Sequence, residues 1–408
     1  MPDVVPFRGL RYQAHVVGQL ADVLVPPYDA LTNQVATTLR TQSRWNLIEL
    51  EAPRRHGKTM LETHRLAART LWEWIRGGVL AWDPEPSYYV YRLRFLYNGV
   101  WQLRTGLIGL AQLHDWSEHV VCPHERTRST WIADRQSLRT ACRADLSLGI
   151  TLVKDPKLRF LSLLRATPCA DQPVIARTPD GALHEISRVT EPSWCRAIQE
   201  QLRYVRLYVA DGHHRYEAAL RHRDATRSPG SSYTMIHIVS AHDPGLIVLP
   251  SHRLIHGVQA PDTIDLPAVR KRRLPYALDQ LAAAWNDDPE IWYTTKEWVD
   301  AFGLCDERSR VDGLAELAHQ LVESTGAGGD EMAITTTPYA HLAINAVASG
   351  TAVAAVLAPA LEPGAVTQVA DQRRTLPPKS TYFWPKPMAG LVLRTLDPPE
   401  AFKVTLHG

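Results

Sequence analysis

Segments with helical spacing of apolar residues alternate along this chain with short apolar runs typical of strands. Residues 59–80, TMLETHRLAARTLWEWIRGGVL, place apolar side chains three and four positions apart and end at two glycines, which predicts a helix. The apolar stretch at 87–113 is interrupted by Asn98-Gly99, a strong signal for a hairpin between two strands. The first hundred residues therefore predict helix followed by paired strands.

Helix and strand patterns continue to alternate up to about residue 258. From about 259 to 345 the period is mainly helical, and residues 346–408 contain strand-like and loop segments. We therefore divide the chain into an α/β region at 1–258, a mainly helical region at 259–345 and a C-terminal segment at 346–408 that returns to the core. Alternation of helices with mixed hairpins indicates an α/β or mixed α+β fold.

The chemically most informative segment is a predicted turn between a strand and a helix, DGHHR at 211–215. The apolar run LYVA precedes it and the helix-forming YEAALRHRDA follows. We expect Asp211 to cap the helix and Gly212 to permit a tight turn, with the first backbone N–H groups facing an anion. His213, His214 and Arg215 add donors at the same helix end, so the turn predicts a phosphate site.

Asp211 does not fit a simple anion site, because a carboxylate repels phosphate. It fits if it binds Mg²⁺ or accepts a proton from an attacking hydroxyl, which are both roles in phosphoryl transfer. The structural alternative is that Asp211 only caps the helix and that the histidines make ordinary hydrogen bonds. A zinc site shared by His213 and His214 is disfavoured, because adjacent residues diverge on a helix.

Composition limits the classes of function. The chain has 408 residues, of which 45% are hydrophobic, and a net charge of +2, which lacks the basic excess of proteins that bind nucleic acid. Its five cysteines lie far apart, and we find neither an apolar run of about 18 residues nor a signal-peptide pattern. We therefore expect a cytoplasmic protein with no membrane and no nucleic-acid partner.

Three further segments carry candidate site residues. Glu125 and Asp134 lie among arginines in HERTRSTWIADR, where they form either a solvated ion-pair network or a site for triphosphate and Mg²⁺. Two prolines stiffen the loop that holds Tyr28 and Asp29, which is either structural or part of a substrate site. Lys379 in LPPKST is either a surface residue or a phosphate contact.

Five motifs in this order, VPPYDAL, HERT followed by ADR, YVADGHHRYEAAL, LPSHRLI and VADQRRTLPPKSTYFWPKPMAGLV, resemble the DUF1015 family over about residues 6–396. The DGHHR turn is in turn similar to the phosphate-binding turn of the ParB/sulfiredoxin superfamily, which includes free-serine kinases. This resemblance implies a ParB/sulfiredoxin-like nucleotide-binding core with mixed sheets and an additional helical or α+β region.

The resemblance also implies roles for the candidate residues, with ATP or ADP and Mg²⁺ as cofactors. Asp211 and Glu125 would share the roles of general base and Mg²⁺ ligand, His213 would act in catalysis, and Tyr28 and Asp29 would contact substrate. The expected nucleotide contacts are Gly212, His213, His214, Arg215, Arg126, Thr127, Arg135 and Lys379.

The function expected from these roles is an ATP- or ADP-dependent small-molecule kinase that phosphorylates a hydroxyl, with a free amino acid such as serine or threonine as acceptor. One alternative is a nucleotide-binding switch without turnover, in which the nucleotide would drive binding of a partner or formation of a homodimer. The other is a metal-dependent phosphohydrolase. We further predict that PPYD, HERT, DGHHR and PPKST converge on one cleft.

Overall fold

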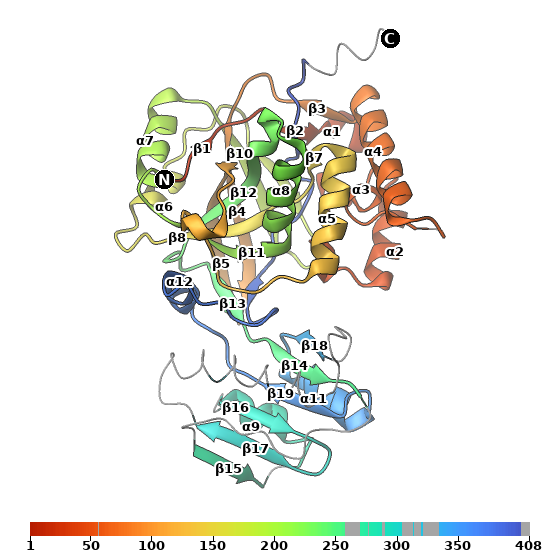
Figure 1. Ribbon diagram of the computed structural model, residues 1–408, viewed down its shortest axis with the longest axis vertical. Coiled ribbons are helices and arrows are strands. Elements are labelled where there is room, and N and C mark those ends of the chain that lie inside the picture. Colours follow the sequence, from red (N-terminus) through yellow and green to blue (C-terminus); the bar gives the residue numbers. More distant parts are fainter. Residues whose placement is uncertain are drawn as a thin grey trace. The chain divides into compact units, whose positions relative to one another are not determined.

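The computed structural model describes residues 1–55, 57–257, 270–275, 277–287, 290–303, 313, 320 and 334–400 (Figure 1). The chain divides into two compact units. The first unit comprises Met1–Pro123, Thr127–Leu246 and the segment from Pro385 onward, and the second comprises His124–Arg126 and Ile247–Trp384. The boundaries predicted at 258 and 345 stay predictions.

A mixed sheet forms the centre of the first unit (Figure 1). Its strands run in the order β6 (Val121–Pro123), β11 (Leu207–Asp211), β8 (Gly149–Val153), β12 (Tyr233–Ser240), β5 (Val100–Gln112), β4 (Tyr88–Tyr97), β10 (Leu183–Val189) and β9 (Val174–Arg177), with β1 (Val4–Val5) paired to β5. The pairs β6–β11 and β8–β12 are parallel, and the others are antiparallel. The prediction of a mixed α/β fold is confirmed.

The hairpin predicted at Asn98-Gly99 joins β4 to β5. Tyr97 faces Val100 in the register, and both turn residues have positive φ angles of 49° and 76°, as a tight two-residue hairpin turn requires. Asn tolerates this region better than most residues and Gly does so without strain, so the sequence specifies the turn locally.

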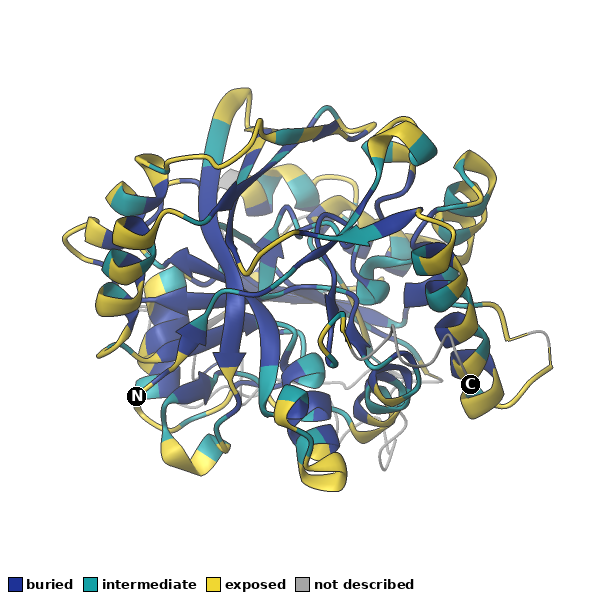
Figure 2. Ribbon diagram, turned by 90° about the horizontal axis from the view of Figure 1, so that it is seen from above, coloured by how far each residue is buried: buried dark blue, intermediate teal, exposed yellow. Residues whose placement is uncertain are grey.

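Three helices lie side by side in the first unit, α4 (Met60–Arg76), α5 (Ser129–Cys142) and α8 (His213–Thr226) (Figure 1). The shorter or more peripheral helices are α1 (Ala14–Val17), α2 (Asn33–Gln42), α3 (Ile48–Glu51), α6 (Arg159–Arg165) and α7 (Pro192–Leu202). Helix α4 ends at Gly77, as its sequence predicts, and begins with a reciprocal cap between Thr59 and Glu62. Figure 2 shows buried strands and helices whose outer faces are exposed.

The C-terminal segment returns to the first unit and runs antiparallel to the N-terminal residues. Val25 pairs with Ala389 and Leu10 with Leu393, while β21 (Arg394–Thr395) pairs with β7 (Ala144–Asp145). In an antiparallel arrangement, residues that follow Val25 lie beside residues that precede Ala389. This register brings the PPYD motif next to the residues around 386.

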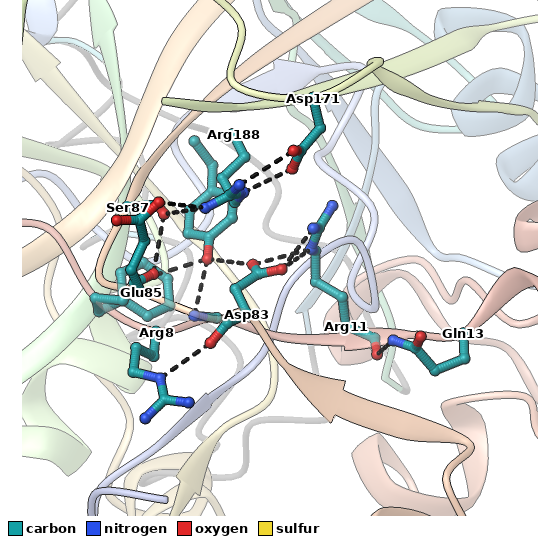
Figure 3. A network of polar contacts seen from close by, with 11 residues as sticks. Arg8, Arg11, Gln13, Asp83, Glu85, Ser87, Asp171 and Arg188 are labelled. Carbon is teal, nitrogen blue, oxygen red and sulfur yellow. Dashed lines mark hydrogen bonds and ion pairs between the residues drawn. The ribbon is translucent and has the colours of Figure 1, made fainter. Parts of the chain in front are cut away.

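A polar network connects β2 (Leu10–Tyr12) to β4 of the central sheet (Figure 3). The carboxylate of Asp83 accepts hydrogen bonds from Arg11 at 2.9 Å and from the Tyr89 hydroxyl at 2.6 Å, and that hydroxyl accepts the Gly9 N–H at 2.8 Å. These bonds anchor β2 (Leu10–Tyr12) and β3 (Leu80–Trp82), which pair with each other. Every member is partnered, which is the condition for a buried polar network to stabilise a fold.

The second unit contains an antiparallel sheet in the order β15 (Arg270–Leu274), β17 (Val299–Gly303), β16 (Ile291–Thr294), β19 (Ala354–Leu357), β14 (His252–Ile255) and β18 (Ile334–Thr337). A second pair joins β13 (Ile247–Leu249) to β20 (Tyr382–Trp384), and the helices are α9 (Leu281–Asp287), α11 (Ala340–Ser349) and α12 (Pro363–Asp371).

The described part of the region predicted as mainly helical, 259–345, contains the strands β15, β16, β17 and β18 besides α9 and the start of α11. Short apolar runs such as IWYT fit a strand and a helix equally well by period alone. Their aromatic and β-branched residues were the better guide. The helix predicted at GLAELAHQLVES falls largely outside the described residues.

Within the described ranges, no helix combines the length and the apolar character needed to span a bilayer. Cys122, Cys142, Cys169 and Cys195 are free thiols, as their spacing predicts, and Cys305 lies outside the described residues.

Buried histidines should make the stability of the protein depend on pH. Burial lowers the pKa of His184 and of His222 to about 4 and that of His252 to about 3. The unfolded chain takes up these protons near pH 6.5, whereas the folded chain does not, so stability should fall as the pH drops from about 6.5 towards 4. The expected slope is about 1.4 kcal/mol per pH unit for each histidine.

Urea unfolding at several pH values between about 5 and 7 measures this slope. In His184→Gln the dependence of the unfolding free energy on pH should decrease by the contribution of one histidine, about 1.4 kcal/mol per pH unit. Equal slopes in the variant and the parent protein would show that His184 is protonated in the folded state.

Candidate functional site

The predicted turn at DGHHR is present. Strand β11 ends at Asp211 and α8 begins at His213, with Gly212 between them at a φ angle of 92°. A Cβ atom on Gly212 would lie 2.8 Å from Nε of Arg215 and 3.0 Å from Cα of Gly149, so conformation and space both require glycine. The expectation that Asp211 caps the helix is wrong, because Gly212 takes the cap position and no side chain caps the first turn.

Asp211 instead belongs to a chain of buried ion pairs. Its carboxylate contacts Arg215 Nη2 at 2.5 Å and Lys386 Nζ at 2.8 Å. Lys386 Nζ also contacts the carboxylate of Asp29 at 2.6 Å. The side chains of Lys386, Asp29 and Asp211 are only 9%, 10% and 15% exposed. Lys386 therefore joins the PPYD motif to the DGHHR turn, and we call Asp29, Lys386, Asp211 and Arg215 the ion-pair cluster.

The charges of the ion-pair cluster set its protonation states. Burial by itself raises the pKa of Asp211, but Lys386 and Arg215 outweigh burial and the charge of Asp29, and they hold the pKa below its usual range. Burial lowers the pKa of Lys386, yet Asp211 and Asp29 raise it above its usual range. At neutral pH the cluster thus contains an ionised Asp211 and a charged Lys386.

Sequence reasoning missed Lys386 as a site residue. The signal was available: Lys386 stands between two prolines in WPKPMAG, inside one of the five motifs. The fully buried Arg104 holds this segment by donating to the Pro385 carbonyl at 2.5 Å. The prolines on both sides of Lys386 have a fixed φ angle, and the buried Arg104 binds the residue before it. The backbone at Lys386 is therefore held in a defined position.

Tyr28 lies between cationic side chains next to the ion-pair cluster. The guanidinium carbon of Arg135 is 4.3 Å from the centre of the Tyr28 ring and that of Arg215 is 5.9 Å from it. Burial raises the pKa of Tyr28, so its hydroxyl stays protonated. Arg135 also donates to the Glu51 carbonyl at 3.1 Å and to Asp134 at 2.9 Å. Protein contacts thus occupy Arg135.

The two histidines of the turn have different surroundings. His213 is buried, with 5% of its surface exposed. Nε2 of His214 accepts the Arg128 N–H at 2.9 Å, and its ring lies 5.3 Å from that of Trp131. His214 was expected to donate to phosphate, but Nε2 acts as an acceptor here. This bond connects Arg128, the residue after the HERT motif, to the DGHHR turn.

Glu125 belongs to a separate cluster in the second unit. Its carboxylate accepts the backbone N–H groups of Lys379, Ser380 and Thr381, each at 3.0 Å, and the Thr381 hydroxyl at 3.0 Å. The Arg126 N–H donates to the Leu376 carbonyl at 3.0 Å. HERT and PPKST are thus brought together, as are PPYD and DGHHR in the first unit. Their convergence on a single cleft stays a prediction.

Glu125→Gln should loosen the PPKST loop. Glutamine has one acceptor oxygen where the carboxylate has two, so the loop loses charge-assisted bonds worth about 1–3 kcal/mol. Amide hydrogen exchange of residues 379–381 should accelerate, while the exposed Glu297→Gln in the same unit should change stability by less than about 0.5 kcal/mol. Unchanged exchange at 379–381 would contradict a structural role of Glu125.

A magnesium ion would find only a partial set of ligands. Among the described residues, no group of three or more histidine, cysteine, aspartate or glutamate side chains comes together to hold a metal. Asp29 and Asp211 supply the hard oxygen ligands that Mg²⁺ shares with phosphate groups and water. The Lys386 ammonium lies between these two carboxylates. The ammonium thus already neutralises both carboxylates, and a magnesium ion at this place stays a proposal.

Comparison with known proteins identifies similar structures. A free serine kinase in complex with AMP is 11% identical with a TM-score of 0.37, and the match covers 65% of this chain and 83% of that chain. SbnI with a C-terminal truncation, from Staphylococcus aureus, is 10% identical with a TM-score of 0.37 and coverages of 73% and 93%. A conserved hypothetical protein from Pyrococcus furiosus is 10% identical with a TM-score of 0.34 and coverages of 65% and 87%.

No protein of curated function matches the chain. The family described as "Protein of unknown function (DUF1015)" matches residues 4–309, well over half of the chain. The family resemblance drawn from the five motifs is confirmed, and the link to the ParB/sulfiredoxin superfamily stays a prediction. The protein belongs to the DUF1015 family.

Proposed function

We propose that the protein is a nucleotide-dependent phosphotransferase that uses ATP or ADP to phosphorylate a hydroxyl group of a small molecule. The observation that carries the proposal is the ion-pair cluster at the start of α8, where an ionised Asp211 lies against Lys386 and Arg215. A free amino acid of the serine or threonine type is the acceptor that we expect from the similarity of the DGHHR turn to that of free-serine kinases.

The turn offers the two properties that phosphoryl transfer needs. The N-terminus of α8 directs the positive end of its dipole to Gly212, where the absence of a side chain permits close approach of a phosphate. Arg215 and Lys386 supply positive charge, which stabilises the charge on a transferring phosphoryl group. Arg126, Thr127 and Lys379 remain proposed nucleotide contacts.

Asp211 is the better candidate than Glu125 for the reacting carboxylate. Four donors of the PPKST loop occupy the oxygens of Glu125. Asp211 has cationic partners that can shift towards phosphate, and it would then accept the proton of the acceptor hydroxyl. Asp29 would share Mg²⁺ with Asp211, and the metal would offset charge on the phosphates.

Incubation with nucleotide, Mg²⁺ and a pool of hydroxylated amino acids, followed by phosphorus NMR, tests this function. A new phosphate ester supports the kinase. Release of free phosphate alone supports a phosphohydrolase instead, and nucleotide that binds but is not consumed supports a switch protein. No binding of either nucleotide would overturn the proposal.

A further inference from the structure

A partly open cavity lies behind the DGHHR turn in the first unit. It has a volume of about 60 Å³ and lies between α8, α5 and the strands β8, β11 and β12. Its wall includes Asp211, Gly212 and Arg215 of the turn and Arg139 of α5. A single water needs about 10–15 Å³ by this measure, so the cavity has room for a larger group.

The acidic residues of the wall already have partners within the protein. Glu51 accepts the Ser147 hydroxyl at 2.9 Å and pairs with Arg135 at 3.4 Å. Asp145 pairs with Arg139 and with Arg394 and accepts the Met235 N–H at 3.1 Å. Asp211 belongs to the ion-pair cluster. Each of these carboxylates thus has a cationic or N–H partner within the protein.

Two arginines of the wall retain unused donors. Among the described residues, Nε of Arg139 and Nε of Arg215 are buried and have no hydrogen-bond partner. The side chain of Arg139 is 7% exposed, and its other nitrogens bind Asp145 and the Tyr233 carbonyl. A buried N–H group without a partner destabilises the folded protein, so a ligand that accepts hydrogen bonds would remove this penalty.

The identity of the unused groups defines the ligand. Both are N–H donors on positively charged side chains, and the N-terminus of a long helix adds the positive end of its dipole. We propose that the cavity binds a small oxyanion, either free phosphate or the terminal phosphate of a nucleotide, with Arg139 Nε and Arg215 Nε as donors. The two donors would hold only the phosphate part of a nucleotide, so a nucleoside without phosphate should not bind.

Calorimetric titration of the nucleotide-free protein with inorganic phosphate tests this site, with chloride added to keep the ionic strength constant. We expect saturable binding and a rise in Tm of about 1–3 °C at about ten times Kd. ADP and AMP form separate arms. Phosphate that binds as well as ADP supports a free oxyanion, whereas binding only by ADP supports a terminal phosphate.

Arg139→Lys is the decisive variant, because lysine keeps the charge opposite Asp145 but lacks the Nε–H. It should weaken phosphate binding about tenfold or more, since a charge-assisted hydrogen bond is lost. Arg221→Lys on the exposed face of α8 is the matched control and should bind like the parent protein. Ala218→Val, which fills part of the wall without changing a charge, should also weaken binding and covers the case in which Arg139→Lys fails to fold.

Absence of saturable binding with every one of these ligands would show that the cavity holds only water. Equal affinities in the parent, Arg139→Lys and Ala218→Val would show that any binding is elsewhere. The titration uses neither acceptor nor turnover, so the oxyanion site can stand if the proposed phosphotransferase activity fails, and it can fail while that activity stands.

Discussion

Lys386→Met should lower the free energy of unfolding by about 3–5 kcal/mol, because it leaves two buried carboxylates, Asp29 and Asp211, without their shared ammonium. Urea unfolding at neutral pH measures the loss. The folded pKa of Asp211 is depressed, so the stability due to this pair is present above pH about 4 and disappears as the pH falls and the carboxylates take up protons. The difference between the variant and the parent should therefore shrink in acid.

Two further proteins control this experiment. Lys157→Met removes an exposed lysine and should change stability by less than about 0.5 kcal/mol. Adding Asp29→Asn to Lys386→Met removes one of the two stranded charges, while Asp211 keeps its ion pair with Arg215, and should recover part of the loss. If Lys386→Met is as stable as the parent at neutral pH, the ammonium does not neutralise buried acids.

Asp211→Asn should lower phosphoryl transfer about 10²- to 10⁴-fold, because the amide cannot accept the acceptor's proton or hold Mg²⁺ as a carboxylate does. Nucleotide binding should persist, since Arg215 and Lys386 keep their charges. Phosphorus NMR with the true acceptor measures turnover, and calorimetric titration measures nucleotide affinity. Arg215→Ala should instead weaken both, because its contact with phosphate exists before the reaction as well.

The same variant also breaks the ion pairs of Asp211, so folding must be measured in parallel. We expect some loss of stability, because Asp211 does not cap α8 but bridges Arg215 and Lys386. Asp224→Asn, exposed on the same helix, is the matched control for both readouts. Full turnover by folded Asp211→Asn would show that the carboxylate of Asp211 has only a structural role.

Local signals predicted much of the first unit. The Asn98-Gly99 hairpin, the glycine end of α4 and the strand–turn–helix at DGHHR each depend on residues adjacent in sequence. The second unit was harder, because strands such as β16 are short and buried, and one of its two pairing partners, β19, lies far along the chain. Period alone does not separate such runs from helices.

The site shows the same division. The sequence identified Asp211, Gly212 and Arg215, because they share one turn, but it assigned the helix cap to Asp211 without knowing that Gly212 adopts a positive φ. Lys386 meets Asp211 across 175 residues of sequence. Long-range contacts such as the pairing of Val25 with Ala389 bring Lys386 to Asp29, and such non-local pairing leaves no periodic signal.

The return of the C-terminal segment also sets an order of events on the ribosome. Lys386 follows Asp211 by 175 residues and Asp29 by 357, and the residues of the second unit from Ile247 to Trp384 are synthesised in between. At about 5–20 residues per second, roughly 9–35 s separate the synthesis of Asp211 from that of Lys386. During this interval the nascent chain carries both acids without the cation that neutralises them. The ion-pair cluster is thus among the last parts of the first unit to form. It can be complete only in a chain whose translation has passed residue 386.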